Sequence, residues 1–401
     1  MSLSNTPTGE RVHIGFFGVR NAGKSSLVNA ITNQSLSVVS DVKGTTTDPV
    51  KKTMELLPLG PVMLFDTPGL DDVGELGELR VAKTYETLRK TDLAVFVTDG
   101  SREFLPEETV FLKELSKRGT PFVLVYNKAD LIADRTRQDG LYVSAATGEG
   151  IHALKEWLAK KGMEAKKEKP LLEGLIDPGD TAVLVIPIDK AAPKGRIILP
   201  QQQTIRALLD TGAKALVCRD VELADTLAAM QTPPRLVITD SQVFGKVAAI
   251  VPESVAMTSF SIIFARYKGD LAQTIQGVAA LKHLKDGDRV LIAEGCTHHR
   301  QCDDIGTVKI PGWIRKQTGK DLDFTFTSGG GFPQDLTPYS LIVHCGGCML
   351  NEKEVQYRFR EAQAQGVPIT NYGILIAHLN GILKRSLMPF GGMDAFLDNP
   401  L

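Results

Sequence analysis

Short apolar runs alternate with amphipathic stretches through the first 165 residues of the chain. Each apolar run is followed by a polar or glycine-containing turn and then by apolar positions at helical spacing, a pattern typical of strands joined by covering helices. The predicted strands are residues 12–17, 62–65, 93–98, 122–126 and 141–143. Because helical segments separate most of these strands, the pattern predicts a mostly parallel α/β sheet.

The same alternation continues in two further blocks. In the first block, predicted strands lie at 182–188, 215–218 and 235–239, with helical patterns at 201–210 and 222–230. In the second block, predicted strands lie at 289–293 and 340–343, with helical patterns at 270–284 and 352–365. The pattern therefore predicts an α/β protein with three domains.

The boundaries of these domains follow from the composition between the blocks. The charged stretch 160–169, followed by Pro170, has no core-forming pattern and predicts a helix that runs into a linker. The predicted parts are a disordered N-terminal tail over 1–10, a first domain over 11–165, a linker over 166–178, a second α/β domain over 179–260 and a third over 261–401.

Composition narrows the classes of protein without naming one. The chain has 401 residues, of which 43% are hydrophobic and 23% charged, as in ordinary globular proteins of more than one domain. The formal net charge is −1, so no global positive field attracts nucleic acid or an anionic membrane. No apolar stretch is long enough to cross a bilayer, and residues 1–11 lack the apolar core of a signal peptide. We therefore expect a cytoplasmic protein with no nucleic-acid partner and no membrane partner.

The clearest chemical motif is a phosphate-binding loop after the first predicted strand. The segment GVRNAGKS, from Gly18 to Ser25, matches the pattern G-x-x-x-x-G-K-S/T. Glycines let successive N–H groups turn toward phosphate, Lys24 reaches the β- and γ-phosphates, and the Ser25 hydroxyl binds Mg²⁺. The predicted nucleotide-binding residues here are Gly18, Asn21, Ala22, Gly23, Lys24, Ser25 and Ser26.

The residues that would complete a magnesium and γ-phosphate site come next, in the expected order. Asp66-Thr-Pro-Gly69 ends a predicted strand, so that Asp66 would hold Mg²⁺ through water and the Gly69 N–H would contact the γ-phosphate. Between the two motifs, Thr46 of the Gly-Thr-Thr-Thr segment is the predicted magnesium-binding threonine of a mobile switch. Lys24, Thr46, Asp66 and Gly69 are the predicted catalytic residues.

Two further motifs predict that the base is guanine. Asn127-Lys128-Ala-Asp130 follows a predicted strand, and the Asp130 carboxylate can accept hydrogen bonds from the guanine N1–H and N2–H groups. Adenine has no donors there, and a buried carboxylate left without donors is costly, so the motif selects GTP over ATP. Ser144 and Ala145, after another predicted strand, would support the guanine O6 with a backbone N–H.

These motifs resemble those of GTPases of the TrmE and Era type. Asn21 matches the loop asparagine that helps bind K⁺ in TrmE-like members, and 44–46 matches their switch motif. Leu70 stands where Ras-like enzymes carry a glutamine that positions water, and an apolar side chain cannot orient water by hydrogen bonding. The resemblance therefore implies slow, potassium-stimulated GTP hydrolysis, with switch loops at 42–48 and 70–79.

A second constellation lies in the last third of the chain. Cys296-Thr-His298 and His344-Cys345-Gly-Gly-Cys348 each follow a predicted strand, and the carboxyl ends of parallel strands share one edge of a sheet. Three thiolates with an imidazole suit either zinc or an iron–sulfur cluster, and spacing alone leaves both open. The sequence predicts no direct ligand role for Cys302, and it predicts that Cys218 is a core residue.

Together, the GTPase motifs and the C-x-H and H-C-x-x-C pair resemble the HydF family of GTPases, which mature di-iron hydrogenases. The resemblance implies a GTPase domain, a middle dimerisation domain and a C-terminal domain that binds a 4Fe–4S cluster through Cys296, Cys345 and Cys348. The fourth ligand would be His298, His344, a carboxylate or solvent. The implied role is a homodimeric or larger scaffold that receives a di-iron precursor from radical-SAM maturases and delivers it to apo-hydrogenase.

Two alternative functions remain. The first is a GTPase of tRNA modification or ribosome assembly with a structural zinc domain, although no basic strip with interleaved aromatic residues predicts an RNA surface. The second is a metal-trafficking GTPase whose cysteines carry zinc or nickel. The colour and metal content of anaerobically purified protein distinguish these alternatives from an iron–sulfur protein.

Overall fold

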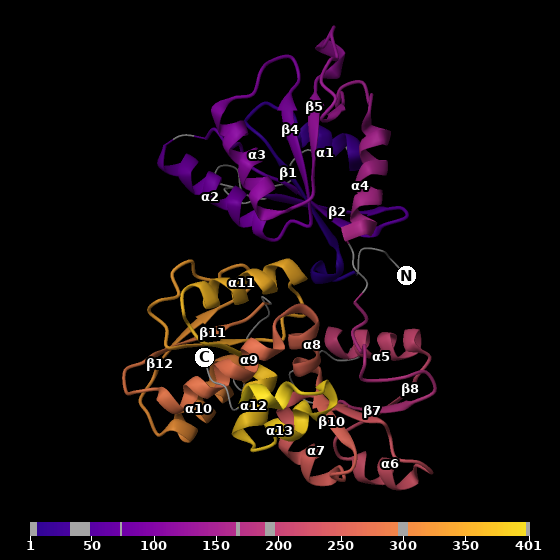
Figure 1. Ribbon diagram of the computed structural model, residues 1–401, viewed down its shortest axis with the longest axis vertical. Helices are drawn as coiled ribbons and strands as arrows, with labels where there is room; N and C mark the ends of the chain where they lie inside the picture. The colour runs from indigo at the N-terminus through magenta and orange to yellow at the C-terminus, as the bar shows by residue number, and fades with distance from the viewer. Residues whose placement is uncertain are drawn as a thin grey trace. The chain divides into compact units, whose positions relative to one another are not determined.

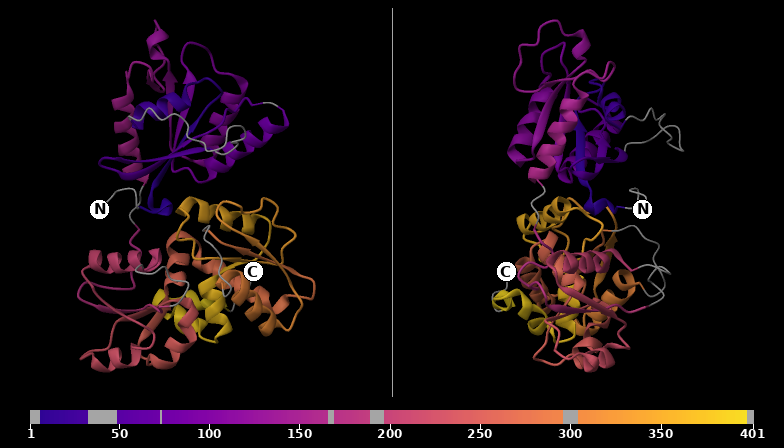
Figure 2. Two further views of the ribbon diagram at one scale, coloured as in Figure 1. Left: turned by 180° about the vertical axis from the view of Figure 1, so that it is seen from behind. Right: turned by 90° about the vertical axis from the view of Figure 1, so that its right-hand side faces the viewer.

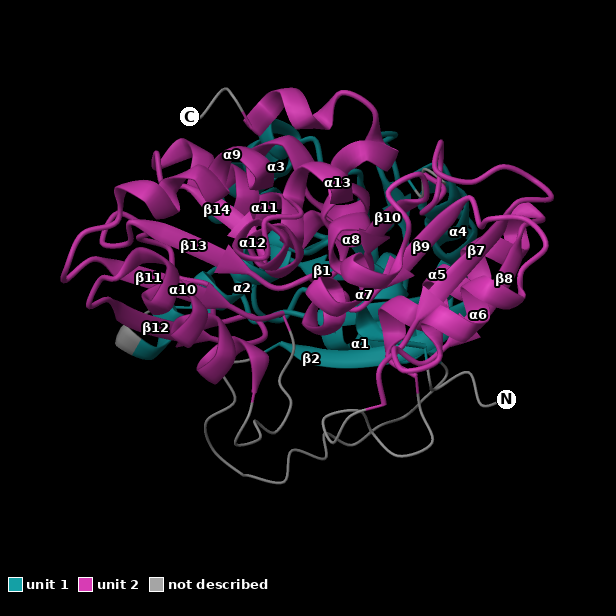
Figure 3. Cartoon of the chain, turned by 90° about the horizontal axis from the view of Figure 1, so that it is seen from below, with its two compact units in different colours: residues 1–168 teal, residues 169–401 magenta. Residues whose placement is uncertain are grey.

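The computed structural model describes residues 6–32, 49–72, 74–165, 169–188, 197–295 and 304–397. The chain divides into two compact units, a first unit over 1–168 and a second unit over 169–401 (Figure 3). No helix in the described ranges is both long and apolar enough to cross a membrane.

The first unit is built on a six-stranded sheet with the order β2-β3-β1-β4-β5-β6 (Figure 1). Its strands are β1 (Val12–Phe17), β2 (Val50–Leu56), β3 (Gly60–Asp66), β4 (Leu93–Asp99), β5 (Phe122–Asn127) and β6 (Leu141–Tyr142). All neighbouring strands are parallel except β2, which runs antiparallel to β3. The predicted mostly parallel sheet is confirmed, and β2 is the strand that the sequence pattern missed.

Helices cover this sheet on both faces (Figure 2). They are α1 (Lys24–Thr32), α2 (Glu75–Arg89), α3 (Pro106–Arg118) and α4 (Ile151–Ala165). Every residue of β1 is buried, as expected for a parallel strand with helices on both sides. Because α2 begins at Glu75, the predicted switch loop over 70–79 was wrong for its second half, which is helical.

The second unit contains two four-stranded parallel sheets (Figure 1). The first has the order β10-β9-β7-β8, with β7 (Thr181–Val185), β8 (Lys214–Cys218), β9 (Leu236–Thr239) and β10 (Ala256–Ser259). The second has the order β12-β11-β13-β14, with β11 (Arg289–Ala293), β12 (Asp323–Thr327), β13 (Leu341–His344) and β14 (Ile369–Asn371). The two further α/β sheets predicted from the sequence are therefore present.

Nine α-helices lie within the described ranges of the second unit. They are α5 (Leu199–Thr211), α6 (Leu223–Ala229), α7 (Phe244–Ile250), α8 (Phe260–Lys268), α9 (Leu271–Val278), α10 (Ile310–Thr318), α11 (Glu352–Ala364), α12 (Tyr372–Leu379) and α13 (Leu383–Leu387). Side chains at the starts of four of them, at Ser259, Asp270, Asn351 and Asn371, accept hydrogen bonds from backbone N–H groups and so cap those helices.

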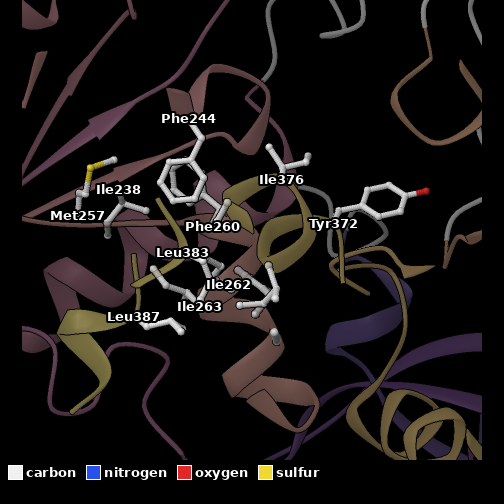
Figure 4. Close-up of a cluster of buried hydrophobic side chains, with 14 of the residues drawn as sticks. Ile238, Phe244, Met257, Phe260, Ile262, Ile263, Tyr372, Ile376, Leu383 and Leu387 are labelled. Atoms are coloured by element: carbon white, nitrogen blue, oxygen red, sulfur yellow. The ribbon is translucent and has the colours of Figure 1, made fainter. Parts of the chain in front are cut away.

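The two sheets of the second unit share one hydrophobic core. Figure 4 shows Ile238 and Met257 of the first sheet beside Phe260 and Ile263 of α8, with Leu383 of α13 among them. A boundary between residues 260 and 261, expected from the sequence, falls at the start of α8 inside this core. Because α8 packs on elements from both sides of that boundary, 169–401 forms one compact unit.

Two smaller expectations about the connecting segments are also corrected. The predicted linker over 166–178 is too long, because Leu171, Leu172, Leu175 and Ile176 are buried in the core of the second unit. The predicted disordered tail over 1–10 includes a short 3₁₀ turn, Thr8–Glu10, whose Thr8 carbonyl lies 3.0 Å from His13 Nε2.

Candidate functional site

The turn between β1 and α1 has the backbone of a phosphate-binding loop. Gly18 and Gly23 have φ angles of 149° and 92°, and Asn21 has a φ of 58°. A Cβ atom on Gly18 would collide with the carbonyl oxygen of Val97, and one on Gly23 with the side-chain amide of Asn127. Glycine is therefore required at both positions, for backbone angle and for space.

Lys24 opens α1 and lies against the phosphate-binding loop. Its Nζ donates to the carbonyl oxygens of Gly18 and Val19, both at 2.8 Å. Burial lowers the pKa of Lys24, while the negative charge of Asp66 opposes this shift. A nucleotide phosphate in the loop would meet this ammonium close to the loop backbone.

Ser25 and Asp66 meet at the carboxyl end of β3. The Ser25 hydroxyl hydrogen-bonds the Asp66 carboxylate, and the Oδ1 atom of Asp66 is buried without a hydrogen-bond partner among the described residues. Burial raises the pKa of Asp66, opposed by that hydrogen bond and by the charge of Lys24. A hydroxyl beside a buried carboxylate oxygen fits a hydrated Mg²⁺. Thr46, the other predicted magnesium ligand, lies outside the described residues.

The segment after β3 packs closely on the phosphate-binding loop. The Leu70 N–H donates to the Gly18 carbonyl at 3.3 Å, and the Leu70 side chain is 8% exposed in the core of the first unit. Gly69 lies against Arg20, where a Cβ atom would come within 2.9 Å of the Arg20 backbone nitrogen. The Arg20 Nε atom lies 3.1 Å from Asp72, so this segment is also held by an ion pair.

At the other end of the loop, Asn127 connects the two motifs that flank it. Its Nδ2 donates to the Ala22 carbonyl at 2.8 Å, and its Oδ1 accepts from the Ala145 N–H at 3.2 Å. The asparagine thus joins the phosphate-binding loop to the segment after β6. Asn127, which the sequence predicts as a nucleotide-binding residue, therefore lines the pocket and links two segments around it.

Lys128, Asp130 and Ser144 form the base end of the site. Lys128 has a φ of 62°, and its ammonium pairs with Asp99 at 2.6 Å. The Ser144 hydroxyl donates to the Asp130 carboxylate and so orients it. An oriented carboxylate can accept from two neighbouring N–H groups of one base, as the guanine interpretation requires.

These residues line one pocket of about 520 Å³. Its predicted lining residues are Asn21, Gly23, Lys24, Ser25, Ser26, Asn127, Lys128, Asp130, Ser144 and Ala145. Leu131 and Ala146 complete the lining. Leu131 was missed because it follows the recognised motif and carries no polar group that would signal a contact with the base.

In the second unit, the strands that lead to the cysteine motifs are neighbours. β11 and β13 pair in parallel, with Ala293 opposite His344, and the Cys345 N–H donates to the Ala293 carbonyl at 3.0 Å. The expectation that the two strand ends share one edge is therefore confirmed. Cys296, His298 and Cys302 lie outside the described residues, so the ligand set is described only on the β13 side.

The Cys345-Gly-Gly-Cys348 loop turns around the sulfur of its first cysteine. The N–H groups of Gly295 and Gly347 donate to Cys345 Sγ at 3.0 and 3.3 Å, and Gly347 has a φ of 65°. Burial raises the pKa of the Cys345 thiol, and burial followed by the charge of Cys345 raises the pKa of Cys348 to about 11. Two desolvated thiols beside N–H donors fit a cation or cluster that displaces their protons.

His344 is held by hydrogen bonds at both ring nitrogens. Its Nδ1 donates to the Cys345 carbonyl at 2.6 Å, and its Nε2 accepts from Arg358 Nη1 at 3.3 Å. Burial, followed by the positive charge of Arg358, lowers the pKa of His344 to about 3. To bind a metal, this imidazole would have to give up one of these bonds. Among the described residues, no three His, Cys, Asp or Glu side chains form a group that could hold a metal ion.

Sequence reasoning missed a buried polar pair beside the cysteine loop. Glu294 follows β11 directly and is 4% exposed, and its Oε1 accepts from the Tyr372 hydroxyl at 3.2 Å. A Cβ atom on Gly306 would collide with both groups. The sequence feature that could have identified Glu294 is a carboxylate directly after an apolar strand. Glu294 is followed by Gly295 and then by Cys296.

The loop, Asp66 with its buried Oδ1 atom, and the guanine motif define the first unit as a P-loop GTPase domain. In agreement, a family model described as a 50S ribosome-binding GTPase matches residues 13–128. Two further family models, described as the hydrogen maturase F dimerization and tetramerization domains, match residues 171–269 and 272–389. The chain belongs to the hydrogen maturase F (HydF) family.

Individual relatives resemble only part of the chain. The tRNA modification GTPase MnmE of Dichelobacter nodosus is 36% identical over 154 residues, which are 37% of this chain and 34% of that protein. MnmE of Nitrosomonas europaea is 33% identical over 158 residues, 38% of this chain and 35% of that protein. The chain thus spans about a third of the length of these curated relatives. Among solved structures, Aquifex aeolicus Era bound to GDP·AlF4⁻ gives a TM-score of 0.33 at 19% identity, over 52% of this chain and 91% of that chain.

Proposed function

We propose that this protein binds GTP with Mg²⁺, hydrolyses it slowly, and carries a 4Fe–4S cluster on Cys296, Cys345 and Cys348. In this proposal it is a scaffold that receives a di-iron precursor from radical-SAM maturases and delivers it to apo-hydrogenase. The observation that carries the proposal is one chain with two sites: a P-loop pocket lined by the residues of the predicted guanine motif, and a thiol loop at the shared end of β11 and β13.

Slow hydrolysis is supported by the position of Leu70 in the segment after β3. Leu70 is buried in the core and its N–H is bonded to the Gly18 carbonyl, so it offers no polar group to an attacking water. Asn21, which lines the pocket, is available to help bind K⁺. We therefore expect a monovalent cation to supply part of the stabilisation that a polar residue provides in Ras-like enzymes.

The cluster assignment is supported by the geometry of the β13 loop and by the family. Cys345 receives two N–H donors, and β11 leads within three residues from Ala293 to Cys296. When held by three thiolates, such a cluster supplies one iron with an exchangeable ligand. The chain's own residues provide the thiolates, the N–H donors and an environment with little water. The fourth ligand is His298, His344, a carboxylate or solvent, and His344 could take this place only by giving up one of its two ring hydrogen bonds.

The oligomeric state follows from the same family. Its two C-terminal domains are described as dimerization and tetramerization domains, so we infer that this chain forms a homodimer or a larger homo-oligomer. β8 is an edge strand with an exposed Val217, and it is our candidate for the contact between copies.

The decisive experiment is anaerobic reconstitution of the full chain with iron and sulfide, followed by absorption and electron paramagnetic resonance spectroscopy. We expect a brown protein with about four irons per chain, and loss of the cluster signal in Cys296→Ser, Cys345→Ser and Cys348→Ser. Cys218→Ser is the matched control, since Cys218 is a buried residue of the other sheet. A colourless protein with stoichiometric zinc would instead support the tRNA-modification or metal-trafficking alternative.

The GTPase half of the proposal has its own measurement. GTP turnover should be faster in potassium buffer than in sodium buffer, and Asn21→Ala should remove the difference while leaving GDP binding in place. Equal turnover of the wild-type protein in the two buffers would contradict the role proposed for Asn21 and K⁺.

A further inference from the structure

Lys268, the last residue of α8, is buried against the cysteine loop. It is 4% exposed, although a lysine ammonium is strongly hydrated in water. Its Nζ donates to three carbonyls of the loop, those of Gly347 at 3.5 Å, Cys348 at 3.1 Å and Leu350 at 2.7 Å. One ammonium therefore satisfies three carbonyls that the turn directs inward.

The position of Lys268 depends on α8. Ser259 caps the start of this helix by accepting from the Ile262 N–H, and the buried face of α8 packs in the core shown in Figure 4. The cap and the core packing hold α8 in place, and Lys268 at its end contacts the loop. Lys268 belongs to the segment that matches the dimerization model, whereas the loop belongs to the segment that matches the tetramerization model.

The charge of Lys268 also lies close to a cysteine of the loop. Its Nζ is 3.1 Å from the backbone carbonyl oxygen of Cys348. A group held by several thiolates carries net negative charge, and a nearby fixed cation in a low-dielectric surround offsets it. Hydrogen bonds and charges around iron–sulfur sites set both the reduction potential and the retention of iron.

We propose that Lys268 is a positioning residue of the iron–sulfur site, which shapes the 345–350 loop and supplies the positive charge that balances its thiolates. The proposal rests on the iron–sulfur function proposed above. It makes α8, from the dimerization segment, part of the metal site. Loss of the ammonium should therefore loosen the loop in the iron-free protein and make a bound cluster harder to reduce and easier to lose.

The test compares Lys268→Met with wild type and with Lys316→Met, which removes the same charge from an exposed position in the same unit. In iron-free full-length protein, Lys268→Met should speed hydrogen exchange of the 346–350 amides about tenfold or more, since each charged hydrogen bond contributes measurably. After anaerobic reconstitution, Lys268→Met should lose iron to a chelator about 10–100-fold faster, with a more negative reduction potential. Lys316→Met should match wild type in amide exchange, in the rate of iron loss and in reduction potential.

Two further variants keep the proposal testable if Lys268→Met does not fold. Lys268→Arg keeps the positive charge and the hydrogen-bond donors, so its reduction potential should equal that of wild type. Lys268→Gln keeps hydrogen-bond donors without the charge, so its reduction potential should be more negative. Wild-type iron retention and potential in Lys268→Gln would overturn the electrostatic role, and unchanged amide exchange in Lys268→Met would overturn the positioning role. Failure of the wild-type protein itself to bind iron and sulfide would count against the proposed function instead.

Discussion

Ionisable side chains with little access to water lie at both sites. Lys24 is bonded to loop carbonyls, Asp66 keeps one buried oxygen without a partner among the described residues, and Lys268 is bonded to three carbonyls. Each such group costs stability unless hydrogen bonds or opposite charges compensate for the lost water. Asp66 is the least compensated of these three, and in the function proposed above its partner is the Mg²⁺ that arrives with the nucleotide.

The first prediction concerns Asp66→Asn in nucleotide-free protein. Burial raises the pKa of Asp66, so above that pKa the folded state carries an unfavourable buried charge that the amide removes. The variant should be more stable at neutral pH by roughly 0.5–2 kcal/mol. Its advantage should disappear as the pH falls through the pKa of folded Asp66, where the wild-type carboxyl takes up its proton. Urea titrations at several pH values provide the measurement.

The same substitution should nearly abolish Mg²⁺-dependent GTP hydrolysis, since the amide cannot hold hydrated Mg²⁺ as a carboxylate does. Asp134→Asn, at an exposed position of the same unit, is the control and should change neither stability nor turnover appreciably. An Asp66→Asn protein less stable than wild type at neutral pH would contradict the argument.

Strands buried on both faces of a sheet were predictable from the sequence, and strands at the edge of a sheet were not. β1, β4 and β5 are buried on both faces and appear in the sequence as continuous apolar runs. β2 was missed because it is an edge strand whose exposed positions carry Lys51 and Glu55, which is how sheets protect an open edge. β14 has three residues, too few for a periodic signal.

The second prediction concerns the β8 edge. Val217 is 48% exposed on this strand, where self-pairing of two copies would bury it. Val217→Asp should weaken self-association about tenfold or more, because a buried carboxylate without a partner costs over ~1.4 kcal/mol. Sedimentation equilibrium gives the measurement. Val308→Asp, equally exposed at 48% but outside this sheet, is the control, and equal weakening by both variants would refute the assignment to β8.

At the scale of the whole molecule, residues 169–401 form one compact unit. Its two sheets have separate strand ladders, yet Ile238 and Met257 of the first sheet (Figure 4) lie in one continuous core with Ile292 and Val343 of the second sheet. The boundary between the units, in contrast, lies at 168/169, and each unit has its own core. Domain limits drawn from sequence pattern and domain limits drawn from packing therefore differ inside the second unit.

The third prediction compares two fragments. Residues 169–401 should fold alone, with a cooperative thermal transition and the iron content of the full chain after reconstitution, because their core is complete. Residues 261–401 should be aggregated or unfolded, because removal of β9, β10 and α7 exposes the apolar face of α8. Circular dichroism melting and analytical ultracentrifugation test both. A stable, monomeric 261–401 fragment would restore the boundary expected from the sequence.

The sequence by itself predicted the nucleotide site, because the residues expected to contact phosphate, Mg²⁺ and guanine lie in short contiguous segments at the ends of predictable strands. It also predicted that the cysteine motifs follow two strands. Only the tertiary structure decided that β11 and β13 are neighbours, that Arg358 occupies the Nε2 of His344, and that Lys268 reaches the loop. Those contacts join residues from separate elements, and side-chain spacing along a chain records only contacts within one element.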